Sequence, residues 1–221
     1  MEGNGNIWHL KKHSNGEATL YLDVPGQTQN TLGRPVLDGF EAYLSELEKS
    51  PPEALFIRSR KKSGFMAGAD IEELSGSSPE ELKALIDQGH KALKRLEALP
   101  CPTVAVIHGT CLGGGLEVAL ACDHRVADMG ASFGFPEVQL GLHPGLGGTE
   151  RFPKLVEPAT ALQFMLTGKT INAKKAKQIG LLRDAVPDRH LDAAAVAAAK
   201  TGKKKKDRGF IDGVKHTLEM S

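Results

Sequence analysis

The stretch HGTCLGGGLEVALACDHRVAD, residues 108–128, decides the fold class of this chain. It follows the compact apolar segment TVAVI, places three glycines before the apolar segment LEVALAC, and ends in a second strand-like segment, HRVAD. Glycines let backbone N–H groups approach a ligand closely, and a helix that begins among them directs those groups outward. A strand, a glycine turn, a short buried helix and another strand, in this order, predict an α/β sheet with crossover connections.

Further strands are expected before this stretch. Residues 7–12 and 17–23 alternate between apolar and polar side chains, which predicts two strands. The turn residues Ser14, Asn15 and Gly16 lie between them, as a hairpin requires. Residues 54–59 are compact and apolar enough to form a buried strand.

Helices are expected between and after the strands. Residues 36–49 are amphipathic, and a second helix begins at Ser78 with Glu81 completing a capping box. The apolar stripe of this second helix is predicted to comprise Leu82, Leu85, Ile86, Leu93 and Leu96. Beyond Pro158 the pattern is helical. We therefore expect one domain over residues 1–190 and a helical tail or linker over residues 191–221.

Bulk composition is that of an ordinary globular protein. The chain has 221 residues, 40% of them hydrophobic and 25% charged, and a formal net charge of +1. Such a balance gives no electrostatic reason to bind nucleic acid or an anionic membrane. The three cysteines, Cys101, Cys111 and Cys122, form no metal-ligand or disulfide pattern, and no segment is typical of a signal peptide or a membrane span. We expect a cytoplasmic protein without a metal site.

Two glutamates stand twenty residues apart in glycine-rich surroundings, Glu117 in GGGLE and Glu137 in FGFPE. Considered singly, Glu117 fits the first turn of a helix and Glu137 fits a turn after Pro136. Glu117, however, is followed by VALAC, and a carboxylate that enters a core without a purpose is costly. Two carboxylates beside backbone N–H donors can divide acid and base work.

Other motifs are weaker. GTCLGGGLE lacks the third glycine of a dinucleotide-binding fingerprint, because Val118 stands there, and LTGKT lacks the first glycine of a P-loop, because Gln163 stands there. In AGAD, Asp70 is expected to cap a helix, so the functional part of that loop would be its backbone. GLGGTERF, residues 145–152, is predicted to form a glycine turn that leads into a helix; it could line a ligand, but a structural role is favoured.

Four motifs resemble the enoyl-CoA hydratase (crotonase) family in order and spacing: FMAGADIEEL, HGTCLGGGLEVALACDHRVAD, FGFPEVQLGLHPGLGGTERFPKLV and LTGKTINAKKAKQIGLLRDAVP. The likeness covers residues 6–187. Within the family, the chain most resembles the hydratase part of the multifunctional fatty-acid β-oxidation α subunit. It implies a spiral of ββα units with a helical C-terminal region, and acyl-CoA thioester substrates. Glu150 departs from the family's more usual glutamine.

The resemblance also implies roles for individual residues. The N–H groups of Ala67 and Gly114 would hold the thioester oxygen, Glu117 would activate water, and Glu137 would exchange a proton at the substrate's α-carbon. The remaining predicted contacts with substrate or coenzyme A are Gly68, Ala69, Asp70, Lys61 and Lys62. No cofactor is expected in this chain, since NAD belongs to the dehydrogenase part of the multifunctional relatives. The chain ends at Ser221 and is therefore expected to be an N-terminal piece, with residues 202–221 mobile or swapped.

The sequence thus predicts hydration of 2-enoyl-CoA in fatty-acid β-oxidation, with Δ3-Δ2-enoyl-CoA isomerisation as a possible second activity. Its expected partners are further copies of itself or a thiolase β subunit. One alternative is RNA binding through Lys203 to Lys206 and Arg208, which lack interleaved aromatic residues. Another is a catalytically inactive assembly module with the same fold.

Overall fold

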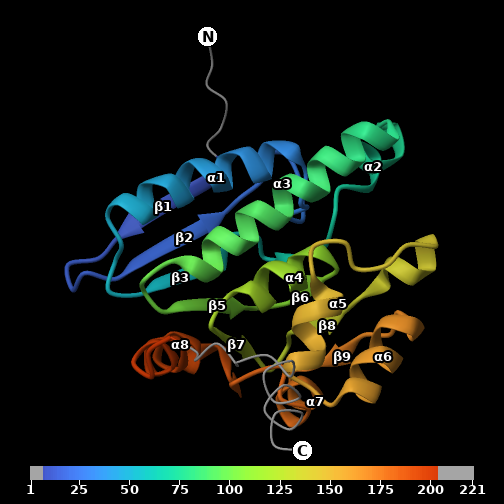
Figure 1. Ribbon diagram of the computed structural model, residues 1–221. Coiled ribbons are helices and arrows are strands. Elements are labelled where there is room, and N and C mark those ends of the chain that lie inside the picture. Colours follow the sequence, from blue (N-terminus) through green and yellow to red (C-terminus); the bar gives the residue numbers. More distant parts are fainter. Residues whose placement is uncertain (1–6, 204–221) are drawn as a thin grey trace, which may run out of the picture.

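The computed structural model describes residues 7–203, and within this part the strands form two sheets (Figure 1). One sheet has the order β1 (Trp8–Lys12), β2 (Ala18–Leu22), β3 (Leu55–Ser59), β5 (Thr103–Ile107), β7 (His124–Asp128) and β10 (Asp184–Val186). The other has the order β4 (Gly64–Met66), β6 (Thr110–Leu112), β8 (Ser132–Gly134) and β9 (Ile171–Asn172). The predicted hairpin is confirmed, because β1 and β2 pair antiparallel.

Helices enclose these sheets. They are α1 (Arg34–Lys49), α2 (Ile71–Gly76), α3 (Pro79–Ala98), α4 (Gly114–Ala121), α5 (Gly148–Arg151), α6 (Pro158–Thr167), α7 (Ala173–Gln178) and α8 (Leu191–Ala199), with 3-10 turns η1 (Pro136–Leu140), η2 (Phe152–Lys154) and η3 (Asp188–His190). In Figure 1, α1 and α3 lie on one face of the larger sheet and α8 lies on the other. Within residues 7–203, no helix is both long enough and apolar enough to cross a membrane.

The connection between the two sheets makes the fold a spiral. Three times in succession, one strand joins the larger sheet and the next joins the smaller one: β3 then β4, β5 then β6, β7 then β8. Helix α3 follows the first pair and α4 the second, so the repeating unit is ββα. The predicted α/β class and the predicted spiral of ββα units with a helical C-terminal part are both confirmed.

Helix α3 differs from prediction on its apolar side. Its capping box between Ser78 and Glu81 is present, but Ile86 is 40% exposed and Leu82 is only partly buried. The face that packs against the core is formed instead by Leu85, Gly89, Ala92, Leu93 and Leu96. Gly89 takes part because α3 lies close to the loop before α5 there, where an added Cβ would lie 2.6 Å from Leu146 Cδ2.

The C-terminal third is less uniformly helical than expected. Strands β9 and β10 interrupt the helices, and the three-residue strands β4, β6 and β8 were not predicted either. Strands this short carry too few residues to show alternation. Helix α8 forms a second apolar core with the larger sheet, through Leu191, Ala195, Ala198 and Ala199. The predicted tail beyond Lys203 lies outside the described residues.

Candidate active site

Glu117 lies in the first turn of α4, and every residue of that helix is buried. The predicted short buried helix is therefore confirmed. The glycine turn before it is required by geometry, because Gly113 has φ of 51° and an added Cβ at Gly115 would lie 2.6 Å from the Met66 carbonyl oxygen. The Glu117 side chain is only 1% exposed, so its carboxylate is carried into the core.

The buried carboxylate of Glu117 is held by two backbone donors. Its Oε1 accepts hydrogen bonds from the N–H groups of Leu146 and Gly148, each at 2.7 Å. An added Cβ at Gly148 would lie 3.0 Å from the same oxygen, which explains a glycine there. The sequence favoured a structural role for this GLGG segment over lining a ligand. The segment holds Glu117, and no local signal in it points to that partner.

The environment of Glu117 favours its protonated form. Burial raises its pKa from 4.5 to about 7, the two N–H donors act against that rise, and the neighbouring charge of Glu137 adds to it. A carboxyl group that titrates near neutral pH can accept a proton and return it under the same conditions.

Glu137 lies on η1, directly after Pro136, and is half-buried. Its Oε2 is buried and has no hydrogen-bond partner within residues 7–203. Burial raises its pKa, while the charge of His143 lowers it. An added Cβ at Gly113 would lie 3.0 Å from Glu137 Oε1, so this carboxylate lies against the glycine turn that begins α4. The structure therefore brings the two predicted glutamates to the same turn.

The predicted donor Ala67 is not free. Its N–H donates to the carbonyl oxygen of Asn30 at 2.8 Å, which contradicts its assignment as an oxyanion donor. Asn30 itself is buried, and its side-chain amide donates to the carbonyls of Leu22 and Phe65 and to the Ser59 hydroxyl. The sequence analysis missed Asn30, which fixes the loop that leads to the site.

One free donor in this loop is Ala69. Leu32 donates to the Gly68 carbonyl at 2.7 Å and accepts from the Asp70 N–H at 3.2 Å, so the Ala69 N–H points away from Leu32. Among the described residues neither Ala69 N–H nor Gly114 N–H has an acceptor. The Ala69 nitrogen would lie 3.9 Å from a Cβ added at Gly114. The two unpaired N–H groups are therefore neighbours.

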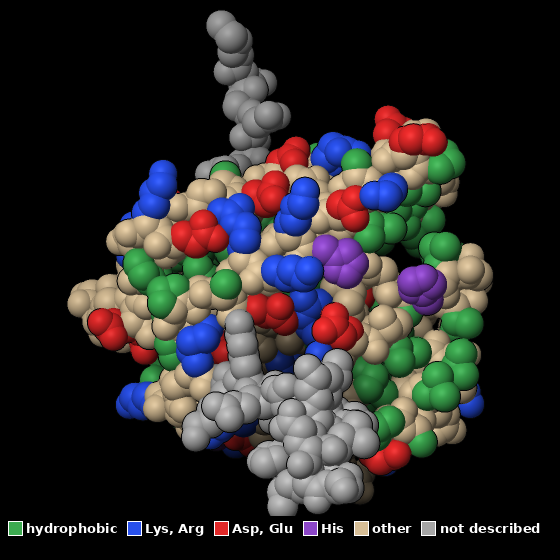
Figure 2. Space-filling view, viewed as in Figure 1, with side chains coloured by type: hydrophobic (Ala, Val, Ile, Leu, Met, Phe, Trp, Pro, Cys, Tyr) green, Lys and Arg blue, Asp and Glu red, His purple; other side chains and the backbone are tan. Residues whose placement is uncertain are grey.

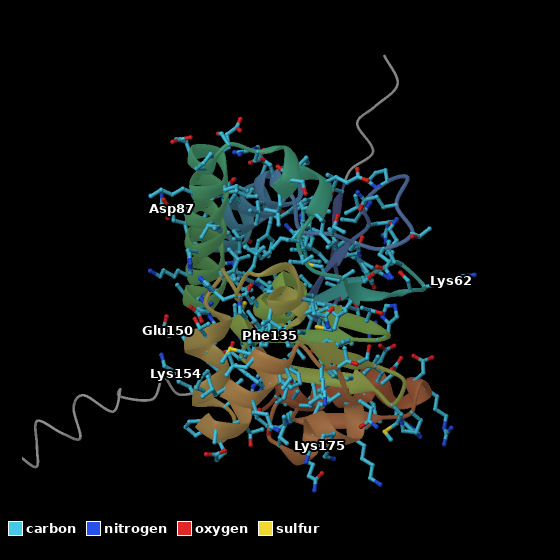
Figure 3. The ribbon with its side chains drawn as sticks, turned by 90° about the vertical axis from the view of Figure 1, so that its right-hand side faces the viewer. Lys62, Asp87, Phe135, Glu150, Lys154 and Lys175 are labelled. Atoms are coloured by element: carbon cyan, nitrogen blue, oxygen red, sulfur yellow. The ribbon has the colours of Figure 1, made fainter. Side chains whose placement is uncertain are left out.

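Of the other side chains predicted to contact substrate or coenzyme A, Asp70 and Lys61 are already bonded within the protein and Lys62 is accessible. Asp70 caps α2, as predicted, by accepting from the N–H groups of Glu72 and Glu73, so its carboxylate is already used. Lys61 is held by Asp23 at 2.7 Å and by the Val24 carbonyl at 2.6 Å. Lys62 is exposed and extends from the edge of the molecule (Figure 3).

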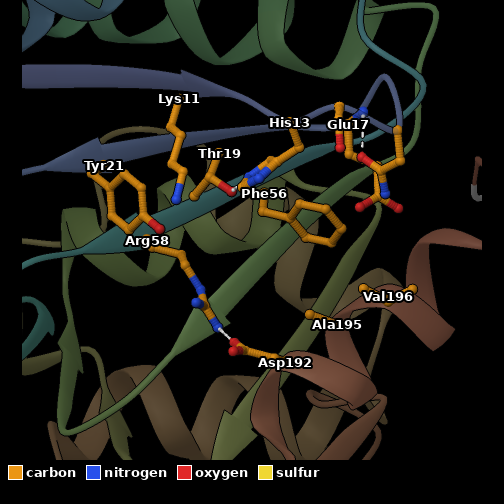
Figure 4. A pocket seen from close by; sticks show the side chains of 12 residues that line it. Lys11, His13, Glu17, Thr19, Tyr21, Phe56, Arg58, Asp192, Ala195 and Val196 are labelled. Carbon is orange, nitrogen blue, oxygen red and sulfur yellow. Dashed lines mark hydrogen bonds and ion pairs between the residues drawn. The ribbon is translucent and has the colours of Figure 1, made fainter.

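A separate cavity of about 500 Å³ lies between strands β1–β3 and α8 (Figure 4). Four of its polar side chains are paired with one another. Arg58 forms an ion pair with Asp192, and the His13 ring lies 2.9 Å from the Thr19 hydroxyl. None of its lining residues belongs to the glycine turn or to the loops around the two glutamates. We therefore do not place the chemistry there.

Comparison with known proteins gives the family of this chain. The profile described as enoyl-CoA hydratase/isomerase matches residues 13–216. The chain belongs to the enoyl-CoA hydratase/isomerase family. The predicted family is thereby confirmed.

Two curated relatives carry the name fatty acid oxidation complex subunit alpha. The one from Shewanella putrefaciens (strain CN-32) is 47% identical over 201 residues, which is 89% of this chain and 28% of the relative. The one from Shewanella halifaxensis (strain HAW-EB4) is 45% identical over 214 residues, 94% of this chain and 30% of the relative. The chain thus spans less than a third of the length of these relatives.

Solved structures of the family share the fold. Enoyl-CoA hydratase from Bacillus anthracis has a TM-score of 0.82 and 30% identity, covering 88% of this chain and 76% of its own. Enoyl-CoA hydratase from Thermoplasma volcanium GSS1 has a TM-score of 0.83 and 26% identity, covering 90% and 80%. The crotonase-like fold inferred from the motifs is confirmed by these similarities.

Proposed function

We propose that this chain adds water across the double bond of 2-enoyl-CoA thioesters, giving 3-hydroxyacyl-CoA. The observation that carries the proposal is the meeting of two carboxyl groups of raised pKa with two unpaired backbone N–H groups. Hydration needs one group to manage water, another to supply a proton to carbon, and a site for the negative charge that forms on the thioester oxygen. These residues meet all three needs, and membership of the enoyl-CoA hydratase/isomerase family supports the assignment.

The thioester oxygen would accept hydrogen bonds from the N–H groups of Ala69 and Gly114. As water adds to the β-carbon, charge moves onto that oxygen and an enolate forms. Gly114 opens helix α4, so the positive end of the helix dipole lies behind its N–H group. One such donor is worth about 2.7–4 kcal/mol at an acyl-transfer site.

The two carboxyl groups would divide the proton transfers. Glu117 Oε1 is occupied by its two backbone donors, which leaves Oε2 to bind water and take its proton as the oxygen attacks the β-carbon. Glu137 would give its proton to the α-carbon, which converts the enolate to the product thioester. Addition of both groups from the same side gives syn hydration. The proton held by Glu117 then restores Glu137 through solvent.

The first test is hydration of crotonyl-CoA by the chain and by Glu117→Gln and Glu137→Gln. Both variants should fold and bind substrate, because each amide fills the same space, and both should lose turnover by about 100-fold or more. Near-normal turnover in either variant would contradict the two-carboxylate mechanism. An inactive parent chain would instead favour the catalytically inactive assembly module.

Δ3-Δ2-enoyl-CoA isomerisation is a second activity that we propose for the same site. It moves a proton between two carbons of the substrate and consumes no water, so Glu137 could carry it alone. Glu137→Gln should then abolish isomerisation, while Glu117→Gln should retain a measurable part of it. The reverse pattern would argue against this division of roles.

Binding of coenzyme A remains part of the proposal. The Gly68–Ala69 backbone lies beside the thioester position, and Lys62 is the accessible amine for a phosphate, since Lys61 is held by Asp23. Lys62→Ala should raise KM for crotonyl-CoA with little change in kcat. An unchanged KM would remove Lys62 from the binding site.

RNA binding receives little support from the geometry. The Lys203 ammonium donates to the Leu99 carbonyl at 2.5 Å and lies 3.6 Å from Asp123, so it is partly committed to the protein. Lys204 to Lys206 and Arg208 lie outside the described residues. Salt-dependent RNA binding below micromolar concentration would be needed to support this alternative.

We also propose that the chain works in a protein complex in the cytoplasm, either with further copies of itself or with a thiolase β subunit. The support comes from the names of its relatives and from exposed apolar side chains. Figure 2 shows apolar side chains gathered on the side of the molecule where η1 and α6 lie. Among those exposed are Val138, Leu140, Leu142, Leu162 and Leu166. Sedimentation of the chain alone, then with a thiolase, would distinguish the two kinds of complex.

A further inference from the structure

The loop that holds Glu117 is itself held by one arginine. Arg151, the last residue of α5, donates from Nη1 to the Leu146 carbonyl at 2.6 Å. Its Nε and Nη2 donate to the two carboxylate oxygens of Glu97 on α3, at 2.6 and 3.2 Å. Since the Leu146 N–H donates to Glu117, a continuous series of contacts runs from Glu97 through Arg151 and Leu146 to Glu117.

Helix α3 holds the same loop at a second point. An added Cβ at Gly89 would lie 2.6 Å from Leu146 Cδ2, so the helix surface meets the Leu146 side chain directly. Between Leu146 and Gly148, Gly147 has φ of 95°, and the Arg151 guanidinium fills the space that a Gly147 side chain would need. The backbone of this loop is therefore fixed from two sides, by α3 and by Arg151.

We propose that Arg151 is a positioning residue for Glu117. Its planar fork joins the Leu146 carbonyl to Glu97, and this orients the Leu146 and Gly148 N–H groups toward Glu117 Oε1. The Arg151 side chain is only 12% exposed, so water screens these bonds weakly. The kinetic consequence rests on the proposed function, because it requires Glu117 to act in hydration. The orientation itself does not.

A simpler explanation is that Arg151 acts only through its charge. The Arg151 cation does lower the pKa of Glu117, although less than the two N–H donors do. The two explanations predict opposite changes in the pKa of Glu117 when Glu97 is removed. Loss of an anion, acting through charge alone, would lower the pKa of Glu117. Loss of the anchor for Arg151 would instead loosen the two donors and raise that pKa.

The test is an NMR titration of the Glu117 side-chain carboxyl carbon in protein labelled with carbon-13 at its glutamates. The Glu117 signal is assigned as the one that is absent in Glu117→Gln. The variants are Arg151→Gln and Glu97→Ala. The matched control is Arg95→Gln, because Arg95 also lies on α3 and forms a bidentate pair with Glu48, at 2.8 Å for both bonds. We expect the pKa of Glu117 to rise in both variants and to stay unchanged in the control.

Hydrogen exchange at the Leu146 and Gly148 amides should quicken in the same two variants. A fall or no change of the Glu117 pKa in Glu97→Ala would overturn the proposal. If Arg151→Gln does not fold, Arg151→Lys replaces it. A lysine keeps the charge but cannot bridge Glu97 and the Leu146 carbonyl as a fork, so a restored Glu117 pKa in that variant would also overturn the proposal.

The kinetic arm uses crotonyl-CoA. In Arg151→Gln and Glu97→Ala, kcat/KM should fall about 100-fold, as for a misplaced catalytic group, and its acidic limb should move to higher pH. Arg95→Gln should keep the parent pH profile. If the parent chain does not hydrate crotonyl-CoA, the proposed function fails, while the titration still decides the role of Arg151.

Discussion

At the scale of residues, the site is built around a carboxyl group in an unfavourable place. Glu117 is almost fully buried, and its raised pKa means that burial disfavours the ionised form. Two backbone donors offset part of that cost without removing it. A residue selected for stability alone would not be a glutamate at position 117. The proposed function of Glu117 therefore lowers the free energy of unfolding.

This cost predicts a stability gain for Glu117→Gln at high pH. The folded pKa is about 7 against 4.5 unfolded, so the folded state retains a proton that the unfolded state releases between these values. Stability is therefore lost as pH rises from 4.5 to 7, by up to about 3 kcal/mol. Glutamine resembles the protonated acid. Urea unfolding should show the variant more stable than the parent at pH 8, with the difference vanishing below about pH 4.

The control for this measurement is Glu150→Gln. Glu150 is exposed and pairs with Lys154 at 3.0 Å, and both lie at the surface in Figure 3. The pKa of Glu150 is lowered by Lys154 rather than raised. Its variant should show no stability gain at pH 8. Parallel pH curves for Glu117→Gln and the parent would mean that Glu117 titrates normally.

At the scale of elements, the three glycines at the start of α4 determine the geometry of the site. Gly113 adopts positive φ, and Gly115 lies against the Met66 backbone, so each is a glycine for its own steric reason. Gly114 has neither constraint. An added Cβ there would meet the Leu32 side chain at 3.2 Å, a contact that a small shift of Leu32 relieves.

These differences predict that two similar substitutions change the unfolding free energy by different amounts. Gly115→Ala would bring a Cβ to 2.6 Å from the Met66 carbonyl oxygen, so we expect a loss of about 1–3 kcal/mol in unfolding free energy. Gly114→Ala keeps the N–H proposed to bind the thioester oxygen and should stay within about 1 kcal/mol of the parent. Thermal unfolding of both variants tests this. Equal losses would show that the Met66 contact is not limiting.

At the scale of the whole molecule, the larger sheet separates two cores. Its α1 and α3 side is continuous with α4, whereas α8 packs on the other side against Phe56, Val104 and Val126. The helix that carries Glu117 and helix α8 thus pack on opposite faces of the same sheet. Disturbing α8 should reduce the stability of the chain before it alters the geometry around Glu117.

Ala198→Asp tests this arrangement. Ala198 is fully buried on the side of α8 that packs on the sheet, and a buried carboxylate without a partner costs several kcal/mol, so we expect a loss of about 3 kcal/mol or more. Ala197 is the neighbouring exposed position, and Ala197→Asp should be close to neutral. Circular dichroism melting compares the two. Similar melting temperatures would mean that α8 contributes little to the fold.

Local sequence patterns determined much of this protein. The hairpin of β1 and β2, the capping box of α3, the Asp70 cap and the buried helix α4 all follow from signals within a few residues. The two glutamates could also be found, because each stands in a glycine-rich frame whose neighbours make a carboxylate conspicuous. The order and spacing of the motifs then indicated the family.

Only the tertiary structure decided which groups complete the site. Leu146 and Gly148 reach Glu117 from 29 and 31 positions away, and Glu97 reaches Arg151 across 54. The choice of Ala69 over Ala67 depends on which N–H the chain around Asn30 and Leu32 already uses. The residue types in a loop specify what it can bond. Which of its N–H groups remains free is decided by the other segments that pack against it, and local sequence does not contain that information.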